Sequence, residues 1–236
     1  MTKKKTSSPT NEMKEWYKIL PKSMTPQYHN PCFDKHKMKI PFRSCIIGGS
    51  GSGKTTLVME MIHRMNDTFG LIILCVKNAD EPLYNFLKSK LKPESLHIYE
   101  NGEVPPLEKY KDEDCQILMI FDDLVNEKNQ KPIIEWFIRG RKLAEGVSMV
   151  YLSQSYFLMP KTIRIQCGYI MLKKLSSTKD LKAILRDFSL GLEPDELMAL
   201  YNYSTEDKTS FLMVDMESPA EERFRKCFLE IIPVPV

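Results

Sequence analysis

The sequence predicts an α/β fold with a mostly parallel central sheet, flanked by helices and followed by strands at its C-terminal end. Short apolar runs such as 71–76 and 116–124 have the length and composition of strands that are buried on both faces. Segments with the apolar spacing of a helix, such as 54–65 and 131–142, alternate with these runs. Alternating strands and helices favour crossover connections, which place the strands parallel to one another.

The remaining elements follow from the same patterns. Further strands are expected at 42–47, 96–100, 147–155 and 168–172, with closing strands within 209–216 and 222–232. Further helices are expected at 81–91, 178–188 and 193–201. Pro132 falls in the first turn of the 131–142 helix, where a missing N–H group is tolerated.

Charge and composition divide the chain into two parts. Residues 1–43 contain ten lysines and arginines against three acidic residues, and several prolines make this stretch poor in regular structure. We therefore expect a basic N-terminal arm over 1–40 and one domain over 41–236 that includes the C-terminal helices and strands. No apolar run approaches a membrane span, and the basic, polar N-terminus does not resemble a secretory signal, so we expect a protein that is not secreted.

A glycine-rich loop follows the first predicted strand of the domain. Its residues fit the phosphate-binding pattern G-x-x-x-x-G-K-[ST], between a strand and a helix. Glycines let the backbone N–H groups turn inward around phosphate oxygens, and the following helix offers its positive end to the anion. We expect a P-loop NTPase that binds ATP through Gly48, Gly49, Ser50, Gly51, Ser52, Gly53, Lys54, Thr55 and Thr56.

Two aspartates end the apolar strand at 116–124. We expect Asp122 to hold Mg²⁺ opposite the Thr55 hydroxyl, and Asp123 to orient or deprotonate an attacking water. Lys54 and Asp122 are 68 residues apart, so their strands are not expected to be consecutive. This spacing favours the group of P-loop ATPases that have an additional strand between the two nucleotide-binding strands. The guanine-reading pattern N-K-x-D is missing, which argues against GTP.

Polar and cationic residues near the same strand ends complete the candidate site. Gln154 ends the 147–155 strand, where it can sense the γ-phosphate or hold the water. Oligomeric motors place an arginine of one subunit against the neighbour's γ-phosphate. Candidates for this role are Arg139, Arg141 and Arg164, of which we favour Arg141 and then Arg164.

The segments GGSGSGKT, IFDDL, RGRKLAEGVSMVYLSQS and MPKTIRIQCGYIML occur in an order that resembles the poxvirus-type genome-packaging ATPases of large DNA viruses and virophages, within the FtsK–HerA superfamily. The resemblance covers roughly residues 40–175 and implies an additional-strand, RecA/FtsK-like P-loop fold. It implies that Lys54 and Thr55 bind phosphate and Mg²⁺, that Asp122 and Asp123 form the acidic pair, and that Gln154 is the strand-end sensor. Arg141 matches the Gly-Arg segment, where Lys142 replaces the histidine that relatives often carry.

The resemblance also implies a Mg²⁺-dependent ATPase that moves double-stranded DNA into a preformed capsid, in the host cytoplasm or the assembling virion. Expected partners are the DNA backbone, capsid or portal-region proteins and identical subunits in a pentameric or hexameric ring. Basic residues in the arm and within 222–227 are candidates for the DNA contact. Two alternatives remain open: a small-molecule phosphotransferase resembling nucleoside kinases, and a nucleotide-switched assembly factor with negligible turnover.

Overall fold

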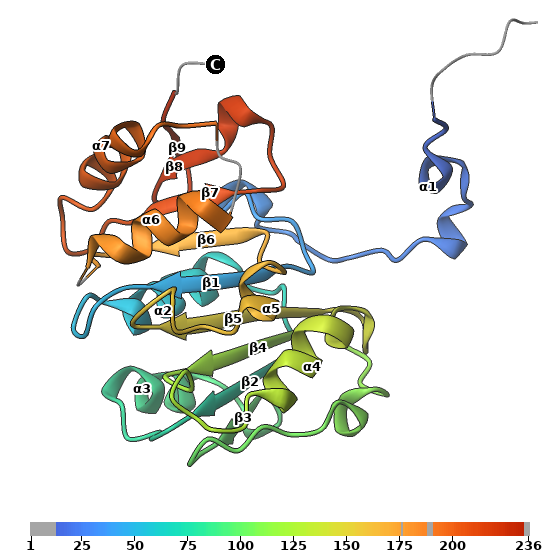
Figure 1. Ribbon diagram of the computed structural model, residues 1–236. Helices are drawn as coiled ribbons and strands as arrows, with labels where there is room; N and C mark the ends of the chain where they lie inside the picture. The colour runs from blue at the N-terminus through green and yellow to red at the C-terminus, as the bar shows by residue number, and fades with distance from the viewer. Residues whose placement is uncertain (1–12, 176, 188–190, 234–236) are drawn as a thin grey trace, which may run out of the picture.

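The structure confirms the predicted α/β class and its mostly parallel sheet. The computed structural model describes residues 13–175, 177–187 and 191–233. Its nine-stranded sheet has the order β3-β2-β4-β5-β1-β6-β7-β8-β9 (Figure 1). Following this order across the sheet, the strands from β3 through β1 to β6 pair in parallel, and those from β6 to β9 pair antiparallel. The strands are β1 Arg43–Ile47, β2 Leu71–Val76, β3 Leu96–Tyr99, β4 Ile117–Asp122, β5 Val147–Ser153, β6 Tyr169–Leu172, β7 Leu212–Asp215, β8 Phe224–Lys226 and β9 Glu230–Ile231.

Helices cover both faces of the sheet and produce two apolar cores. One core contains buried side chains of α4, α5, α6 and α7, and the other contains those of α2 and α3. Figure 1 shows α4, α5 and α6 in front of the sheet and α2 behind it. No helix of the described ranges is long and apolar enough to cross a bilayer. The helices are α1 Trp16–Ile19, α2 Lys54–Arg64, α3 Pro82–Lys90, α4 Lys131–Arg139, α5 Lys161–Arg164, α6 Thr178–Asp187 and α7 Pro194–Ser204.

As the spacing of Lys54 and Asp122 predicts, β1 and β4 are not consecutive in the chain, since β2 and β3 lie between them. In the sheet, β5 lies between β1 and β4. In the parallel register, Ile47 of β1 is opposite Ser153 of β5, and Leu152 of β5 is opposite Asp122 of β4. The carboxyl ends of the three strands therefore lie at one edge of the sheet and at nearly the same level. The residues that follow each strand are brought together by backbone pairing.

The C-terminal strands are tied together by a buried ion pair. Arg225 of β8 donates to Asp215 of β7 at 2.9 Å, and both side chains are almost fully buried. Ser218 donates to the same carboxylate at 2.8 Å, so the charges are shielded from water but hydrogen-bonded. The neighbouring Lys226 pairs with Glu206. Two of the three basic residues in the segment 222–227, Arg225 and Lys226, thus have acidic partners inside the protein.

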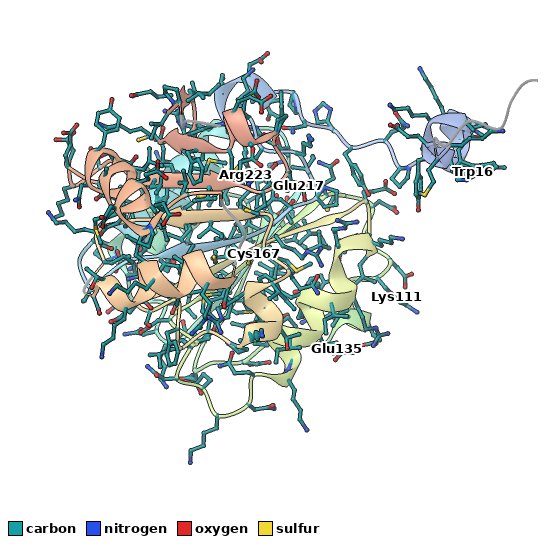
Figure 2. The ribbon with its side chains drawn as sticks, turned by 45° about the horizontal axis from the view of Figure 1, so that its top comes forward. Trp16, Lys111, Glu135, Cys167, Glu217 and Arg223 are labelled. Atoms are coloured by element: carbon teal, nitrogen blue, oxygen red, sulfur yellow. The ribbon has the colours of Figure 1, made fainter. Side chains whose placement is uncertain are left out.

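The N-terminal segment contains two structurally different stretches. Helix α1 stands clear of the domain, and Trp16 on it is 68% exposed (Figures 1 and 2). Further along, His29 and Gln116 exchange hydrogen bonds of 2.7 and 2.8 Å between backbone and side chain. Met38 is fully buried in the core on the α2 side. The stretch before β1 thus packs on the domain, whereas the stretch around α1 does not.

His36 makes the stability of this packed segment depend on pH. The imidazole is fully buried, and its Nδ1 accepts the Met38 N–H at 3.1 Å. Burial, followed by the charges of Arg64 and Lys37, lowers the pKa of His36 from 6.5 to about 4. Between these values the unfolded chain binds more protons than the folded one, so stability is present above pH 6.5 and is lost as the pH falls toward 4.

We expect His36→Asn to remove most of this pH dependence, because the Asn carbonyl can accept the Met38 N–H but does not titrate. The wild type is expected to lose up to about 2 kcal/mol more than the variant between pH 7 and pH 5. Urea denaturation at the two pH values measures this difference. Equal losses in the two proteins would contradict the assignment.

Candidate nucleotide site at the carboxyl edge of the sheet

The glycine loop connects β1 to α2 and is hydrogen-bonded to the end of β5 and to the segment that follows β6. Gly48 N donates to Ser153 O at 3.1 Å, and Gly49 N donates to Lys174 O at 2.9 Å. Gly53 caps α2 in the left-handed conformation, with φ at 87°. A Cβ on Gly48 would lie 2.4 Å from Ser52 Oγ and 2.7 Å from Lys173 Cβ. The loop therefore requires glycine at both ends, at one for space and at the other for backbone conformation.

Lys54 begins α2, and its ammonium faces the centre of the loop. Nζ donates to Gly48 O at 2.9 Å and to Gly49 O at 3.2 Å. Burial lowers the pKa of Lys54, and the charges of Asp122 and Asp123 oppose that shift. The lysine is thus close enough to both carboxylates to interact with them, as one site requires.

Thr55 and Asp122 are joined by a third residue, Tyr84 of α3. The Tyr84 hydroxyl donates to Asp122 Oδ2 at 2.5 Å and also hydrogen-bonds to the Thr55 side chain. Burial, followed by the charge of Asp122, raises the pKa of Tyr84 far above its usual value, so the hydroxyl remains a donor. Burial also raises the pKa of Asp122, against the opposing effects of Tyr84 and Lys54. Asp122 and Thr55 therefore face each other within the reach of one hydroxyl group.

The two consecutive aspartates have different surroundings. Asp123 adopts the left-handed conformation, with φ at 55°, which aspartate tolerates better than most residues. Its exposed carboxylate accepts a 3.3 Å hydrogen bond from Gln154 Nε2, at the end of β5. Asp122 is half-buried and bonded to Tyr84. The turn after β4 thus separates one carboxylate that contacts Thr55 through Tyr84 from one that contacts Gln154.

The residues present fit a phosphate group with a magnesium ion. Ser52 Oγ is buried without a hydrogen-bond partner, and it lies in a loop that leaves room for no added Cβ at Gly48. Within the described ranges, no group of three or more His, Cys, Asp or Glu side chains could hold a metal. Mg²⁺ commonly takes only one or two protein ligands beside phosphate oxygens and water. Thr55 and Asp122 have the oxygen chemistry for that limited share.

Further residues at this edge were not singled out from the sequence. Lys173 is almost fully buried below the loop, and its Nζ donates to Lys208 O at 2.7 Å and Ser210 O at 2.9 Å. Burial lowers its pKa. A cavity of about 440 Å³ separates the loop from the segment 206–208, with Lys174 and Leu175 on its wall. The two lysines directly after the apolar 168–172 run were an available signal, since that run ends beside the loop. The sequence carried no signal for Tyr84, because its spacing on α3 predicts only an ordinary apolar core position.

The candidate arginines do not lie at this edge. Arg141 is exposed before β5, where it lines a cavity with Phe42 and Tyr169 at the amino ends of β1 and β6. Arg139 pairs with Glu135 on the surface of α4. Arg164, by contrast, is 7% exposed, pairs with Asp187 at 2.8 Å and lies over the Tyr156 ring. The structure therefore brings together Lys54, Thr55, Asp122, Asp123 and Gln154, but none of the three arginines.

The close approach at Gly48 predicts a specific loss of nucleotide binding. Gly48→Ala should displace Ser52 or the backbone around it, and thereby weaken ATP binding at least about 10-fold, which corresponds to ~1.4 kcal/mol. Gly168→Ala is the matched control, because its added Cβ meets only the flexible Glu217 side chain, at 3.0 Å. Titration with a fluorescent ATP analogue and thermal unfolding of both variants check the claim. Normal binding by a folded Gly48→Ala protein would contradict it.

Comparisons with known proteins agree with this fold. The genome packaging NTPase B204 from Sulfolobus turreted icosahedral virus 2, in complex with AMP, has a similar structure, with a TM-score of 0.56 and 15% identity over 84% of this chain and 100% of that chain. Its complex with ATP-gammaS gives a TM-score of 0.54 and 15% identity over 83% and 100% of the two chains. B204, the DNA-packaging ATPase from Sulfolobus turreted icosahedral virus, gives a TM-score of 0.56 and 14% identity over 84% of this chain and 100% of that chain. At these identities the likeness shows the fold.

A search of curated protein sequences found no significant match. The family model of the Poxvirus A32 protein matches residues 31–230, which include every strand except the last residue of β9 and all the residues of the candidate site. The chain therefore belongs to the Poxvirus A32 protein family.

Proposed function

We propose that this protein is a Mg²⁺-dependent ATPase that moves viral double-stranded DNA into a preformed capsid. The main observation in support of ATPase activity is that the Tyr84 hydroxyl hydrogen-bonds to both Thr55 and Asp122, and that Lys54 lies beside them. Membership of the Poxvirus A32 family and the likeness in fold to two DNA- or genome-packaging NTPases support the motor part. The complexes of B204 with AMP and ATP-gammaS support nucleotide binding.

The residues of the site have separate tasks in this proposal. Gly48 to Gly53 surround the phosphates with backbone N–H groups, and Lys54 leaves its loop carbonyls to contact the outer phosphates. Thr55 and Asp122 hold Mg²⁺, which neutralises the charge on the phosphates when bound. Asp123 orients the attacking water or accepts its proton, and Gln154, hydrogen-bonded to Asp123, fixes that carboxylate and contacts the γ-phosphate.

The phosphotransferase alternative fits this arrangement less well. A kinase acting on a small acceptor needs only the loop and one metal-holding aspartate, so the hydrogen-bonded pair of Asp123 and Gln154 counts against it. Its acceptor also requires an enclosed pocket beyond the γ-phosphate, and the cavity beside the loop is instead lined by Lys174 and the segment 206–208. The assembly-factor alternative shares the whole site and differs only in turnover, so measurement of turnover separates it.

DNA is expected to contact the protein through its phosphate backbone, without reading bases. The basic N-terminal arm is the favoured contact, because Arg225 and Lys226 in the second candidate segment are bonded to Asp215 and Glu206. Further partners in this proposal are identical subunits in a ring and the capsid or portal-region proteins. The protein acts in the infected cell or in the assembling virion.

ATP turnover with and without double-stranded DNA tests the proposed activity. We expect Mg²⁺-dependent phosphate release that double-stranded DNA stimulates several-fold, and that rising salt suppresses because the contact is electrostatic. Asp123→Asn should lower the rate by about 10²–10⁴-fold, the usual contribution of a general base. Asp67→Asn is the matched control, since Asp67 is also exposed and left-handed, with φ at 60°, but lies before β2.

Equal and negligible rates for wild type and Asp123→Asn would favour the nucleotide-switched assembly factor. Phosphate transfer to a small acceptor by a monomer would favour the kinase. A protein that hydrolyses ATP but neither binds double-stranded DNA nor changes its rate with it, even in the assembled form, would be an ATPase but not a packaging motor.

Arg141 is the favoured candidate for a catalytic contact between subunits. It is exposed at the amino edge of the sheet, opposite the edge that carries Lys54, so any contact with a γ-phosphate has to be made in a neighbouring subunit. Arg164 is a weaker candidate, because its guanidinium is buried against Asp187 and Tyr156. Arg139 is already paired with Glu135 on its own helix.

Mixing two inactive variants tests this shared site. Arg141→Ala alone should reduce DNA-stimulated turnover by about 10³-fold or more, the usual contribution of such an arginine. Mixed with Lys54→Ala subunits, it should recover activity, since some interfaces then combine an intact Lys54 with an intact Arg141. Arg139→Ala, two residues away, is the control and should keep its rate. Normal turnover by Arg141→Ala, or no recovery in the mixture, would contradict the assignment.

A further inference from the structure

We propose that Tyr84 is a positioning residue of the magnesium centre: its hydroxyl holds one oxygen of Asp122, so that the other oxygen is presented to the ion opposite Thr55. This inference rests on the proposed Mg²⁺-dependent function. It adds a residue from a third element, α3, to a site otherwise built from the end of β4 and the start of α2. No sequence motif places a tyrosine there.

The hydrogen bond has the geometry of a strong interaction with an ionised acceptor. The O–O distance between Tyr84 and Asp122 Oδ2 is 2.5 Å, which is typical of a hydroxyl bonded to a carboxylate. The Tyr84 side chain is only 2% exposed and packs in the core formed with α2 and α3. Its ring is therefore held in place by packing, and the hydroxyl position is fixed relative to the sheet.

The fixed hydroxyl restricts a side chain that otherwise has freedom. Rotation about the last torsion of Asp122 exchanges Oδ1 and Oδ2, and that torsion has only broad preferences. With Oδ2 bonded to Tyr84, Oδ1 remains as the oxygen for a metal ligand. The same hydroxyl also bonds the Thr55 side chain. One tyrosine thus sets the orientation of both groups that are proposed to hold the ion, as outer partners of metal ligands do elsewhere.

The packing of the ring and the action of the hydroxyl can be separated by Tyr84→Phe. This variant keeps the apolar ring in its core and removes only the oxygen. Tyr169→Phe is the matched control: Tyr169 is 1% exposed, and its hydroxyl accepts the Lys39 N–H at 2.9 Å at the amino edge of the sheet. Any general effect of removing a buried tyrosine hydroxyl is expected in both variants. Loss of the contact with Asp122 and Thr55 is expected only in Tyr84→Phe.

The experiment measures binding of fluorescent mant-ATPγS, first in EDTA and then over a series of Mg²⁺ concentrations. We expect Tyr84→Phe to need about 10–100-fold more Mg²⁺ than wild type for half-maximal enhancement of binding, the usual effect of removing an outer partner of a metal site. Affinity in EDTA should stay within about twofold. Tyr169→Phe should match wild type in both conditions.

A double-mutant cycle with Asp122→Asn shows whether Tyr84 acts through the carboxylate. Asp122→Asn should weaken the Mg²⁺ response, and adding Tyr84→Phe should change it by no more than about twofold further. Independent, fully additive effects would overturn the proposal. So would an unchanged Mg²⁺ response in Tyr84→Phe, or an equal loss of binding in EDTA. If wild type itself binds the nucleotide without any response to Mg²⁺, the proposed Mg²⁺-dependent function fails first, which is a distinguishable result.

Discussion

The parallel pairing of β5 with β1 and β4 is the constraint on which the candidate site depends. Backbone hydrogen bonds place Ile47 opposite Ser153, and Leu152 opposite Asp122. The glycine loop, Gln154 and Asp123 come directly after these strands, and Asp122 is the last residue of β4. A shift of one residue in either pairing would turn the strand-end side chains to the other face. The geometry of the site is thus set mainly by the sheet and is then refined by side chains.

The side-chain interactions at this edge distribute the negative charges among different partners. Tyr84 and Lys54 interact with Asp122, which is half-buried, whereas the exposed Asp123 bonds to Gln154. Two adjacent residues thereby acquire the surroundings of a metal ligand and of a group that handles water. The left-handed backbone at Asp123 makes this separation possible, and its modest conformational strain is typical of functional sites.

Much of this arrangement was predictable from the sequence, and the exceptions have physical reasons. Apolar runs identified the strands, and the 68-residue separation of Lys54 and Asp122 indicated that β1 and β4 are not consecutive in the chain. Strands β2 and β3 lie between them in sequence, whereas β5 follows β4 in the chain and lies between β1 and β4 in the sheet. Helical spacing marks Tyr84 only as a core position and is silent on where its hydroxyl points. The burial of Arg164 depends on Asp187, which is distant in sequence and meets it only through the packing of α5 and α6. Such pairings are decided by tertiary structure, which local patterns do not encode.

The central proposal is that Asp122 and Thr55 bind the same divalent ion. Crystals grown with ATPγS and Mn²⁺, a scatterer that replaces Mg²⁺, test it most directly through anomalous diffraction. The account predicts one peak beside the phosphates whose nearest protein oxygens are those of Thr55 and Asp122, in contact directly or through one water. A bound triphosphate whose ion lies away from both residues would contradict it.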